Sequence, residues 1–586
     1  MTILALFAVF VLGTSVLTAA LYRVQVSDVA QFRKRQARQA TRRIGIAGRR
    51  GRILDRAGGV LADSRPRYDI VCNLEFFRNK GGISNTVNAI DAEITHLALV
   101  VRLPRTVERS RIERHLRESS ALPMTVWRDM DASALARFAE RSADFPGFSE
   151  TVRAERIYPC GSLAAHVLGY TGRGRPDSLT GDSVVHFYEE LEMKGRSGVE
   201  GYYDGFLAGT PGERLVRVDA RGFRKDVDTI ERRQEHGPDL RLTIDVGIQR
   251  ALEKALEGVS GAGVVLDPRD GAVLALASAP TFNPDEWQEN HRKLLDDPAR
   301  PLYNRAVSGL YPPGSIFKPV TAMAAMQRKG TDGSFGWTPD DKYDCPGVFV
   351  LGDMRIHCWD RYGHGPIALC KAIEQSCNTY FCNLGHLLGT NFLFRTAGEF
   401  GLGQKTGIDL GAEAAGCIYG EPWYAGNTCQ TAIGQGMLLV TPLQMAVVCA
   451  AFANGGSVVV PYLHDRGSGN AHRRPIRRIG CDAADMEIVR AGMRDVVESG
   501  TGRRIRTRYG EDRRRFNLRA ACAGKTGTAE RGRGRKDAWV IAFAPYEDPQ
   551  IAVAMVVENG ESGGKTTAPR VHDVLAHIFG EEEVSP

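Results

Sequence analysis

The sequence predicts an α+β protein with an N-terminal transmembrane helix, and three observations support that prediction. Residues 2–21 are uncharged and mostly apolar, which is long enough for one helix to cross a bilayer. Strand-like segments lie near residues 240–278 and again near 539–558. The stretch between them has the apolar spacing of helices. Strands from both ends of such a stretch pair into an antiparallel sheet that packs against a helical cluster.

Composition is that of a globular chain with more than one domain. The 586 residues are 43% hydrophobic and 25% charged, which leaves room for two or more domains. The net charge is +7, and eleven lysine and arginine residues lie between Arg23 and Arg56. Attraction to anionic lipid or to a polyanionic wall is one interpretation of this run, but a solvated arm near the membrane is favoured. No nucleic-acid-binding signature accompanies the run, so nucleic acid is not an expected partner.

The apolar segment is expected to remain attached as an anchor. A cleaved signal peptide is the alternative, because residues 18–20 are small. Signal peptides usually have a basic start and a shorter apolar core, and this segment has neither. The basic residues follow the segment, where the positive-inside rule would place them in the cytoplasm. Large domains, however, translocate largely regardless of flanking charge.

The first half of the chain predicts short strands and amphipathic helices without a catalytic cluster. Residues 50–62 alternate around Gly58-Gly59, which indicates a strand, a turn and a second strand. Glu200 is expected to be a hydrogen-bonding residue of the fold rather than an acid catalyst. Polar residues 231–239 mark a boundary. The other expected elements here are a strand over 68–72 and helices over 87–101 and 112–122.

The second half begins with a predicted strand over residues 240–245 and a helix over 248–256. Residues 262–278 indicate two strands joined by a Pro-Arg-Asp-Gly turn. Apolar runs at 539–544 and 551–558 predict two further strands of the same sheet.

One stretch between these strands carries the first sign of chemistry, Tyr311-Pro-Pro-Gly-Ser-Ile-Phe-Lys-Pro-Val320. The prolines and Gly314 predict a turn that leads into a helix, with Ser315 in its first turn. Ser315 and Lys318 are three residues apart, so on a helix they share a face. A partly buried amine loses its proton more readily and can act as base toward a serine hydroxyl. The pair alone is a weak signal, because chance matches to Ser-x-x-Lys are common.

Two more motifs follow in order along the chain, Ser376-Cys377-Asn378 after an apolar helical run and Lys525-Thr526-Gly527-Thr528 before an apolar strand. The ordered set Ser-x-x-Lys, Ser-x-Asn and Lys-Thr-Gly is associated with penicillin-binding proteins and serine β-lactamases. The chain resembles class B penicillin-binding proteins, which are peptidoglycan transpeptidases, and most of all their elongation-type members. The resemblance implies a membrane anchor (1–22), an elongated non-catalytic pedestal domain (23–238) and a transpeptidase domain of the penicillin-binding and serine β-lactamase type (239–586).

The resemblance also assigns roles to the motif residues. Ser315 would be the acylated nucleophile and Lys318 its base. Ser376 would pass a proton to the departing D-alanine, and Asn378 would bind the substrate backbone and orient Lys318. Lys525 would supply positive potential near Ser376 and the substrate carboxylate. Thr526 and Thr528 would offer hydroxyls to that carboxylate, while Gly527 allows close backbone approach. The oxyanion hole would be formed by the backbone N–H groups of Ser315 and Thr528.

A zinc site is a further expectation. Cys345, Cys358, His364 and Cys377 are separated by 12, 5 and 12 residues, which matches no zinc-ribbon spacing. Some elongation-type members resemble this chain in holding zinc with a histidine and the cysteine inside Ser-x-Asn, and His364 and Cys377 match those positions. Cys345 and Cys358 stand where aspartates would be expected. The zinc would be structural, and no cofactor is expected for catalysis; a Cys345–Cys358 disulfide or unpaired thiols are the alternatives.

Partners and alternatives follow from the same resemblance. Expected ligands are peptidoglycan stem peptides and β-lactams, and expected partners are a RodA-type membrane glycosyltransferase and elongation-complex proteins. The implied location is the cytoplasmic (inner) membrane, crossed once, with the catalytic domain outside. A division-type class B transpeptidase is the nearest alternative. A D,D-carboxypeptidase, a β-lactamase and a non-enzymatic penicillin sensor are the others.

Overall fold

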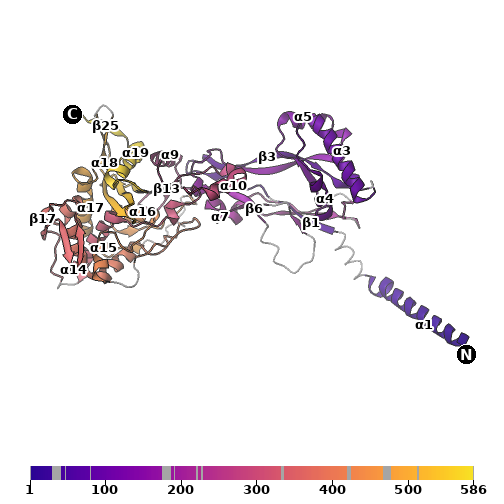
Figure 1. Cartoon of the computed structure of the whole chain (residues 1–586), viewed down its shortest axis with the longest axis horizontal. Helices are drawn as coiled ribbons and strands as arrows, with labels where there is room; N and C mark the ends of the chain where they lie inside the picture. Colours follow the sequence, from indigo (N-terminus) through magenta and orange to yellow (C-terminus); the bar gives the residue numbers. More distant parts are fainter. Residues whose placement is uncertain are drawn as a thin grey trace.

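The molecule is elongated, and the chain runs from an isolated helix at one end to a large mixed domain at the other (Figure 1). The structure is a computed structural model. It describes residues 2–29, 41–46, 48–78, 81–174, 187–189, 192–219, 222–225, 229–331, 335–418, 424–465, 467, 477–510, 514–532 and 534–584. Part of the basic run, residues 30–40, therefore lies outside the described residues.

The N-terminal helix α1 (Thr2–Tyr22) stands clear of the rest of the molecule (Figure 1). Its side chains are exposed, and the helix continues through one turn of π-helix, Arg23–Ser27. The described chain contains one helix that is long and apolar enough to cross a membrane, with a mean hydropathy of 2.4. The predicted apolar helix over residues 2–21 is confirmed.

The next domain is narrow and is built around two long paired strands, β3 (Val60–Cys72) and β5 (Phe148–Ile157). One sheet has the order β11-β2-β3-β4 with β5 on β3, and a second has the order β10-β9-β1-β7. Three helices pack with the far ends of β3 and β4 around Ile70, Ile90 and Phe138. The bounds are β1 (Thr41–Ile46), β2 (Ile53–Leu54), β4 (Met124–Trp127), β7 (Phe187–Glu189), β9 (Gly212–Arg217), β10 (Thr229–Arg232), β11 (Leu240–Arg241), α3 (Ile83–Val101), α4 (Arg109–Glu118) and α5 (Ala132–Glu140).

A buried charge cluster closes the base of this domain. Glu200 is fully buried on α7 (Gly198–Tyr202) and accepts hydrogen bonds from the Nε atoms of Arg50 and Arg156, both at 2.6 Å. Arg50 also pairs with Asp204 at 2.6 Å. The expectation for Glu200 is confirmed. Arg50, by contrast, is 6% exposed and departs from the solvated-arm interpretation, because its partners come from residues 150 positions further on.

The C-terminal domain contains a five-stranded antiparallel sheet in the order β13-β12-β24-β23-β22. Alternate side chains of its strands enter two separate cores. Val264 and Ile541 face the core that contains α16, whereas Val265 and Val540 face the core formed with α9 and α19. The predicted α+β fold class is confirmed. The bounds are β12 (Gly261–Leu266), β13 (Val273–Ala279), β22 (Ala523–Glu530), β23 (Lys536–Ala544), β24 (Ile551–Val557), α9 (Val246–Ala255), α16 (Pro442–Ala453) and α19 (Ala568–Phe579).

One sequence expectation differs from this sheet, because the strand expected over residues 240–245 is only two residues long, β11. Lys525–Thr528 precedes the predicted apolar strand, which is β23, and itself lies inside β22, a strand that was not predicted. Because β22 is rich in alanine, glycine and threonine, it has no apolar run to mark it; its pairing with β23 makes it a strand.

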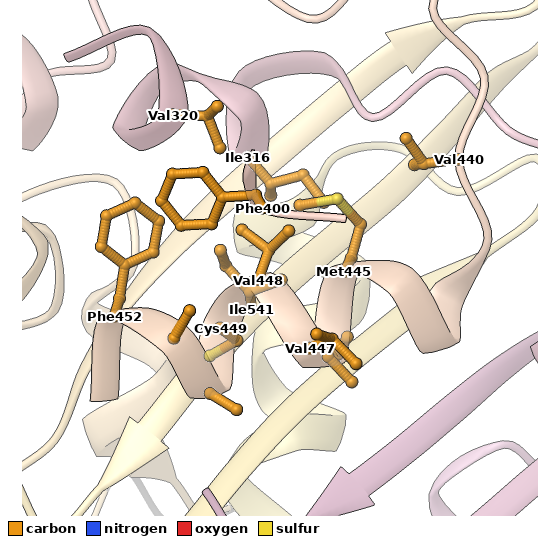
Figure 2. Packing of buried hydrophobic residues seen from close by; sticks show 14 of the residues in the cluster. Ile316, Val320, Phe400, Val440, Met445, Val447, Val448, Cys449, Phe452 and Ile541 are labelled. Carbon is orange, nitrogen blue, oxygen red and sulfur yellow. The ribbon is translucent and has the colours of Figure 1, made fainter. Parts of the chain in front are cut away.

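Helix α16 supports the loop that carries the first motif. Thr441 and Gln444 form a reciprocal capping box at its start, and all twelve of its residues are buried. Figure 2 shows Met445 and Val448 of this helix lying beneath Ile316 and Val320 of the first motif.

Five further helices and two small two-stranded sheets lie on the site side of the domain. They are α12 (Lys318–Thr331), α13 (Leu369–Glu374), α14 (Asn378–Glu399), α15 (Ala425–Ala432), α17 (Ala483–Glu498), β14 (Tyr343–Cys345), β15 (Val348–Leu351), β16 (Met354–His357) and β17 (Gly365–Ile367). Strand β14 pairs with β17, and β15 pairs with β16.

Candidate active site

The first motif lies on a tight turn that is held from two sides. Residues Gly314–Phe317 form one 3-10 turn that leads directly into α12. Gly314 has φ +59° and donates its N–H to Gly434 O at 2.7 Å. A Cβ atom on Gly434 would lie 2.0 Å from Gly314 O, so only glycine fits beneath the turn. Trp539 Nε1 donates to Pro312 O at 3.0 Å from the sheet side.

Lys318 is fully buried and joins the first motif to the second. Its Nζ donates to Ser376 O at 2.7 Å, to Asn378 Oδ1 at 2.8 Å and to Ser376 Oγ at 3.2 Å. Burial lowers the pKa of Lys318 to about 8, so its amine is readily neutral. Within the described chain all the side-chain hydrogen bonds of Lys318 go to the second motif, whereas its backbone N–H donates to Ser315 O.

The third motif reaches the same hydroxyl from the opposite side. Lys525, also fully buried, donates from Nζ to Ser376 Oγ at 2.8 Å and to Thr526 O at 3.0 Å. Burial, followed by repulsion from Lys318, lowers the pKa of Lys525 well below its usual value. Ser376 itself has φ +55°, a strained conformation for a residue with a side chain. The backbone thus turns sharply to place this hydroxyl between two lysines.

These groups meet in one cleft of about 860 Å³. Ser315 is half-buried in the wall of this cleft. The turn that carries it packs closely against Gly527 of β22, because a Cβ atom at position 527 would lie only 3.0 Å from Pro313 O. The sequence-predicted residues that line the cleft are Ser315, Ser376, Asn378, Thr526, Gly527, Thr528 and Cys358.

Several cleft residues carried no sequence signal. Thr501 follows α17, and its Oγ1 lies 2.7 Å from Thr526 Oγ1, so it fixes a hydroxyl of the third motif. The glycines on both sides of Thr501 indicate a turn, which was the one sequence signal at this position. Gln435 donates to Thr528 O at 3.5 Å, and Trp359 donates to Gln375 O at 2.7 Å. Their positions depend on contacts between distant segments, which the sequence did not mark.

Beside the second motif, Cys345, Cys358, His364 and Cys377 form a cluster whose candidate ligand atoms all lie within 4.8 Å of one another. His364 Nδ1 is 3.5 Å from both Cys345 Sγ and Cys358 Sγ, and Cys358 Sγ is 3.9 Å from Cys377 Sγ. Cys345 and Cys358 are both free thiols, so the alternative Cys345–Cys358 disulfide is not formed.

The cluster fits zinc. Tetrahedral zinc with bonds of about 2.3 Å to sulfur and about 2.0 Å to nitrogen has edges of about 3.8 Å between sulfurs and about 3.5 Å between sulfur and nitrogen. The separations in the cluster, 3.9 Å between Cys358 Sγ and Cys377 Sγ and 3.5 Å between His364 Nδ1 and Cys345 Sγ, match those edges. The other ring nitrogen of His364, Nε2, is buried and lacks a hydrogen-bond partner among the described residues. The sulfurs are therefore the groups that orient this ring.

Fold and site together define the class of penicillin-binding enzymes. The family model "Penicillin binding protein transpeptidase domain" matches residues 261–576, and "Penicillin-binding Protein dimerisation domain" matches residues 45–242. The chain belongs to the penicillin-binding protein family.

Individual relatives are similar over most of their length. The peptidoglycan D,D-transpeptidase MrdA of Acinetobacter baumannii is 34% identical, with 88% of this chain and 78% of the relative covered. The structure of PBP2 in complex with MreC from Helicobacter pylori is similar with a TM-score of 0.76 and 25% identity, covering 92% of this chain and 98% of that one. A structure concerned with polymerization and crosslinking by a peptidoglycan synthase complex contains a chain with a TM-score of 0.70 and 29% identity, covering 99% of this chain and 98% of that one.

Proposed function

We propose that the protein is a peptidoglycan D,D-transpeptidase that cross-links stem peptides during cell elongation through an acyl-enzyme on Ser315. The observation that carries the proposal is the pair of buried lysines that share the Ser376 hydroxyl in a cleft lined by Ser315. The similar MrdA of Acinetobacter baumannii, which is a peptidoglycan D,D-transpeptidase, supports the elongation role.

In the acylation step Ser315 Oγ attacks the carbonyl between the two terminal D-alanine residues. Lys318 takes the hydroxyl proton, which its lowered pKa allows near neutral pH. Ser376 delivers a proton to the departing D-alanine, with Lys525 behind it. The backbone N–H groups of Ser315 and Thr528 hold the developing oxyanion, and each such donor is worth about 2.7–4 kcal/mol in the transition state.

The same cleft binds the donor peptide and then the acceptor. Thr526 and Thr528 offer hydroxyls to the terminal carboxylate, while Lys525 holds the Ser376 hydroxyl beside them. Asn378 contributes an amide to the peptide backbone. After D-alanine leaves, an acceptor amine attacks the Ser315 ester and forms the cross-link. β-Lactams resemble the donor and acylate the same hydroxyl.

A zinc ion held by Cys345, Cys358, His364 and Cys377 would serve the fold of the site. Bound there, it would supply a structural cross-link between the β14–β17 and β15–β16 strand pairs and the start of α14, and it takes no part in the reaction. Elemental analysis of the purified full chain tests this. About one zinc per chain, lost in a His364→Ala variant, is the expected result, and the absence of stoichiometric zinc rejects the site.

The protein is proposed to lie in the cytoplasmic membrane, crossed once by α1, with the catalytic domain outside. The chain has no segment assigned to glycan polymerisation among its matched domains, so a RodA-type glycosyltransferase would supply the strands. The similar chain in the peptidoglycan synthase complex supports such a partner. The similar PBP2 in complex with MreC supports contact with elongation proteins.

The decisive assay supplies nascent uncross-linked glycan strands to the full chain in detergent. Cross-linked stem peptides and an equal amount of D-alanine are expected, and both vanish with Ser315→Ala. Release of D-alanine without cross-links would instead indicate a carboxypeptidase.

A further inference from the structure

Two thiols of the cysteine cluster lie close enough to be joined by a small movement. Cys358 Sγ and Cys377 Sγ are 3.9 Å apart. A disulfide has a sulfur–sulfur bond of about 2.0 Å, so the two atoms need to approach by about 2 Å. Cys358 lies in a loop after β16, where its sulfur can shift without moving a long helix.

One of the two thiols can be reached from the active-site cleft. Cys358 is among the residues that line the cleft, although it is only 4% exposed. Cys377 is fully buried behind it. A small oxidant that enters the cleft therefore meets Cys358 first and finds Cys377 next to it.

The third thiol, Cys345, shares a hydroxyl with Cys377. Thr379 Oγ1 donates to Cys345 Sγ at 3.0 Å and lies 3.3 Å from Cys377 Sγ, which also accepts the Tyr380 N–H at 3.5 Å. Cys358 Sγ meets Cys377 Sγ directly at 3.9 Å, whereas Cys345 and Cys358 each contact His364 Nδ1 at 3.5 Å. Cys358 and Cys377 are accordingly the pair that oxidation would join.

We propose that Cys358 and Cys377 form an oxidation site that is open when the metal is absent. A hydroperoxide oxidises the Cys358 thiol to a sulfenic acid and is reduced to water or an alcohol. The Cys377 thiol then attacks the Cys358 sulfur, water leaves, and the disulfide forms. In total two thiols lose two electrons and two protons to one hydroperoxide. A zinc ion prevents the reaction, because coordination occupies both sulfurs.

The disulfide would reach the chemistry through the backbone of the second motif. Cys377 is the N-cap of α14, and its neighbours Ser376 and Asn378 accept all the side-chain hydrogen bonds of Lys318 in the described chain. Although the loop of Cys358 takes most of the movement, the part that falls on Cys377 displaces Ser376 and Asn378 relative to Lys318. This consequence rests on the proposed function, whereas formation of the disulfide does not.

The test uses the full chain in detergent, in a zinc-loaded and a chelator-treated form, each exposed to hydrogen peroxide. Remaining thiols are then blocked, and peptides are mapped by mass spectrometry. A Cys358–Cys377 cross-link is expected in the chelated sample and not in the zinc-loaded one. In the chelated sample, labelling by a fluorescent penicillin is expected to fall about tenfold or more and to return with a dithiol reductant, since small misplacements at a site have effects of this size.

Two variants distinguish oxidation of the Cys358–Cys377 pair from oxidation of other thiols in the chain. Cys358→Ser should form no cross-link, and peroxide should not lower its labelling below its own untreated level. Cys382→Ser, which removes another buried thiol of α14, should behave like the wild type. Free thiols at 358 and 377 after peroxide in the chelated chain, a Cys345–Cys358 cross-link, or unchanged labelling despite the cross-link would each overturn the proposal. A reduced wild type that takes no penicillin contradicts the proposed function instead, and the peptide map still decides the oxidation site.

Discussion

At the scale of single residues, the centre of the site is one hydroxyl oxygen shared by two buried amines. Ser376 Oγ lies 3.2 Å from Lys318 Nζ and 2.8 Å from Lys525 Nζ. Burial lowers the pKa of both amines, and repulsion from Lys318 lowers the pKa of Lys525 further. This arrangement provides a neutral amine beside the nucleophile turn without help from an acidic residue.

The pH dependence of acylation should follow Lys318. Burial lowers the pKa of Lys318 to about 8, and only its neutral form can accept the Ser315 proton. The second-order rate of acylation by a penicillin should therefore rise about tenfold per pH unit from about pH 6 and level off above about pH 8. Lys318→Arg is the control: its guanidinium keeps its proton, so the variant should stay slow throughout. A wild-type rate that is flat across this range contradicts the role of Lys318.

A second prediction concerns the positive φ angle of Ser376 and its effect on stability. Ser376→Ala and Ser376→Gly both remove the hydroxyl, so each should slow acylation by about 10²- to 10⁴-fold. Only glycine adopts φ +55° without strain, so the glycine variant should be more stable by about 1 kcal/mol. Denaturant unfolding of the two variants measures the difference. Equal stability would mean that position 376 does not hold the strained conformation.

At the scale of elements, the nucleophile turn depends on a glycine contact beneath it. Gly434→Ala would place a Cβ atom 2.0 Å from Gly314 O, in addition to the strain of φ +75°. The variant should lose at least about tenfold in acylation rate, because the turn that carries Ser315 must shift. The acylation rate is measured from the time course of labelling by a fluorescent penicillin.

The matched control for this variant is Gly455→Ala. Gly455 has φ +78°, but a Cβ atom there would meet nothing within 4 Å. It carries the same backbone strain without the clash, so it should lower stability slightly and leave acylation unchanged. If both variants label alike, the contact between Gly434 and Gly314 does not position the nucleophile.

The three motifs were predictable because each is short and local, with turn and capping residues that mark its place. The resemblance also implied two contacts between them, Asn378 with Lys318 and Lys525 with Ser376, and both are present. The bonds from Lys318 to the carbonyl and hydroxyl of Ser376 were not predicted, because they join segments that are distant in sequence. Strand β22, in which Lys525 lies, was not predicted either, because its strand signal is weak and pairing with β23 forms it. Thr501 was missed because a lone threonine between glycines resembles any loop.

At the scale of the whole molecule, an elongated shape requires a stiff connection between the membrane end and the catalytic end. Strand β3 runs along the narrow domain (Figure 1), where it pairs with β5. On α7, Glu200 joins Arg50 and Arg156. A buried carboxylate between two guanidinium groups ties distant segments together. Removing it takes the carboxylate partner from Arg156 and leaves Arg50 paired with Asp204 alone.

Glu200→Gln should accordingly destabilise the pedestal domain by about 3–5 kcal/mol. The exposed pair Arg141–Asp144, with side chains 51% and 52% exposed, is the control, and Asp144→Asn should cost less than about 1 kcal/mol. Hydrogen exchange of peptides from β3 and β5 measures both. Equal protection in the two variants would show that the buried cluster does not hold this domain together.

The claim on which the account depends is that three distant motifs meet at one acylated hydroxyl. It is tested most directly by treating the full chain with a penicillin and locating the adduct by peptide mass spectrometry. The account predicts a single adduct per chain on the peptide that contains Ser315, and none in Ser315→Ala. An adduct on any other residue, or one that persists in that variant, would contradict it.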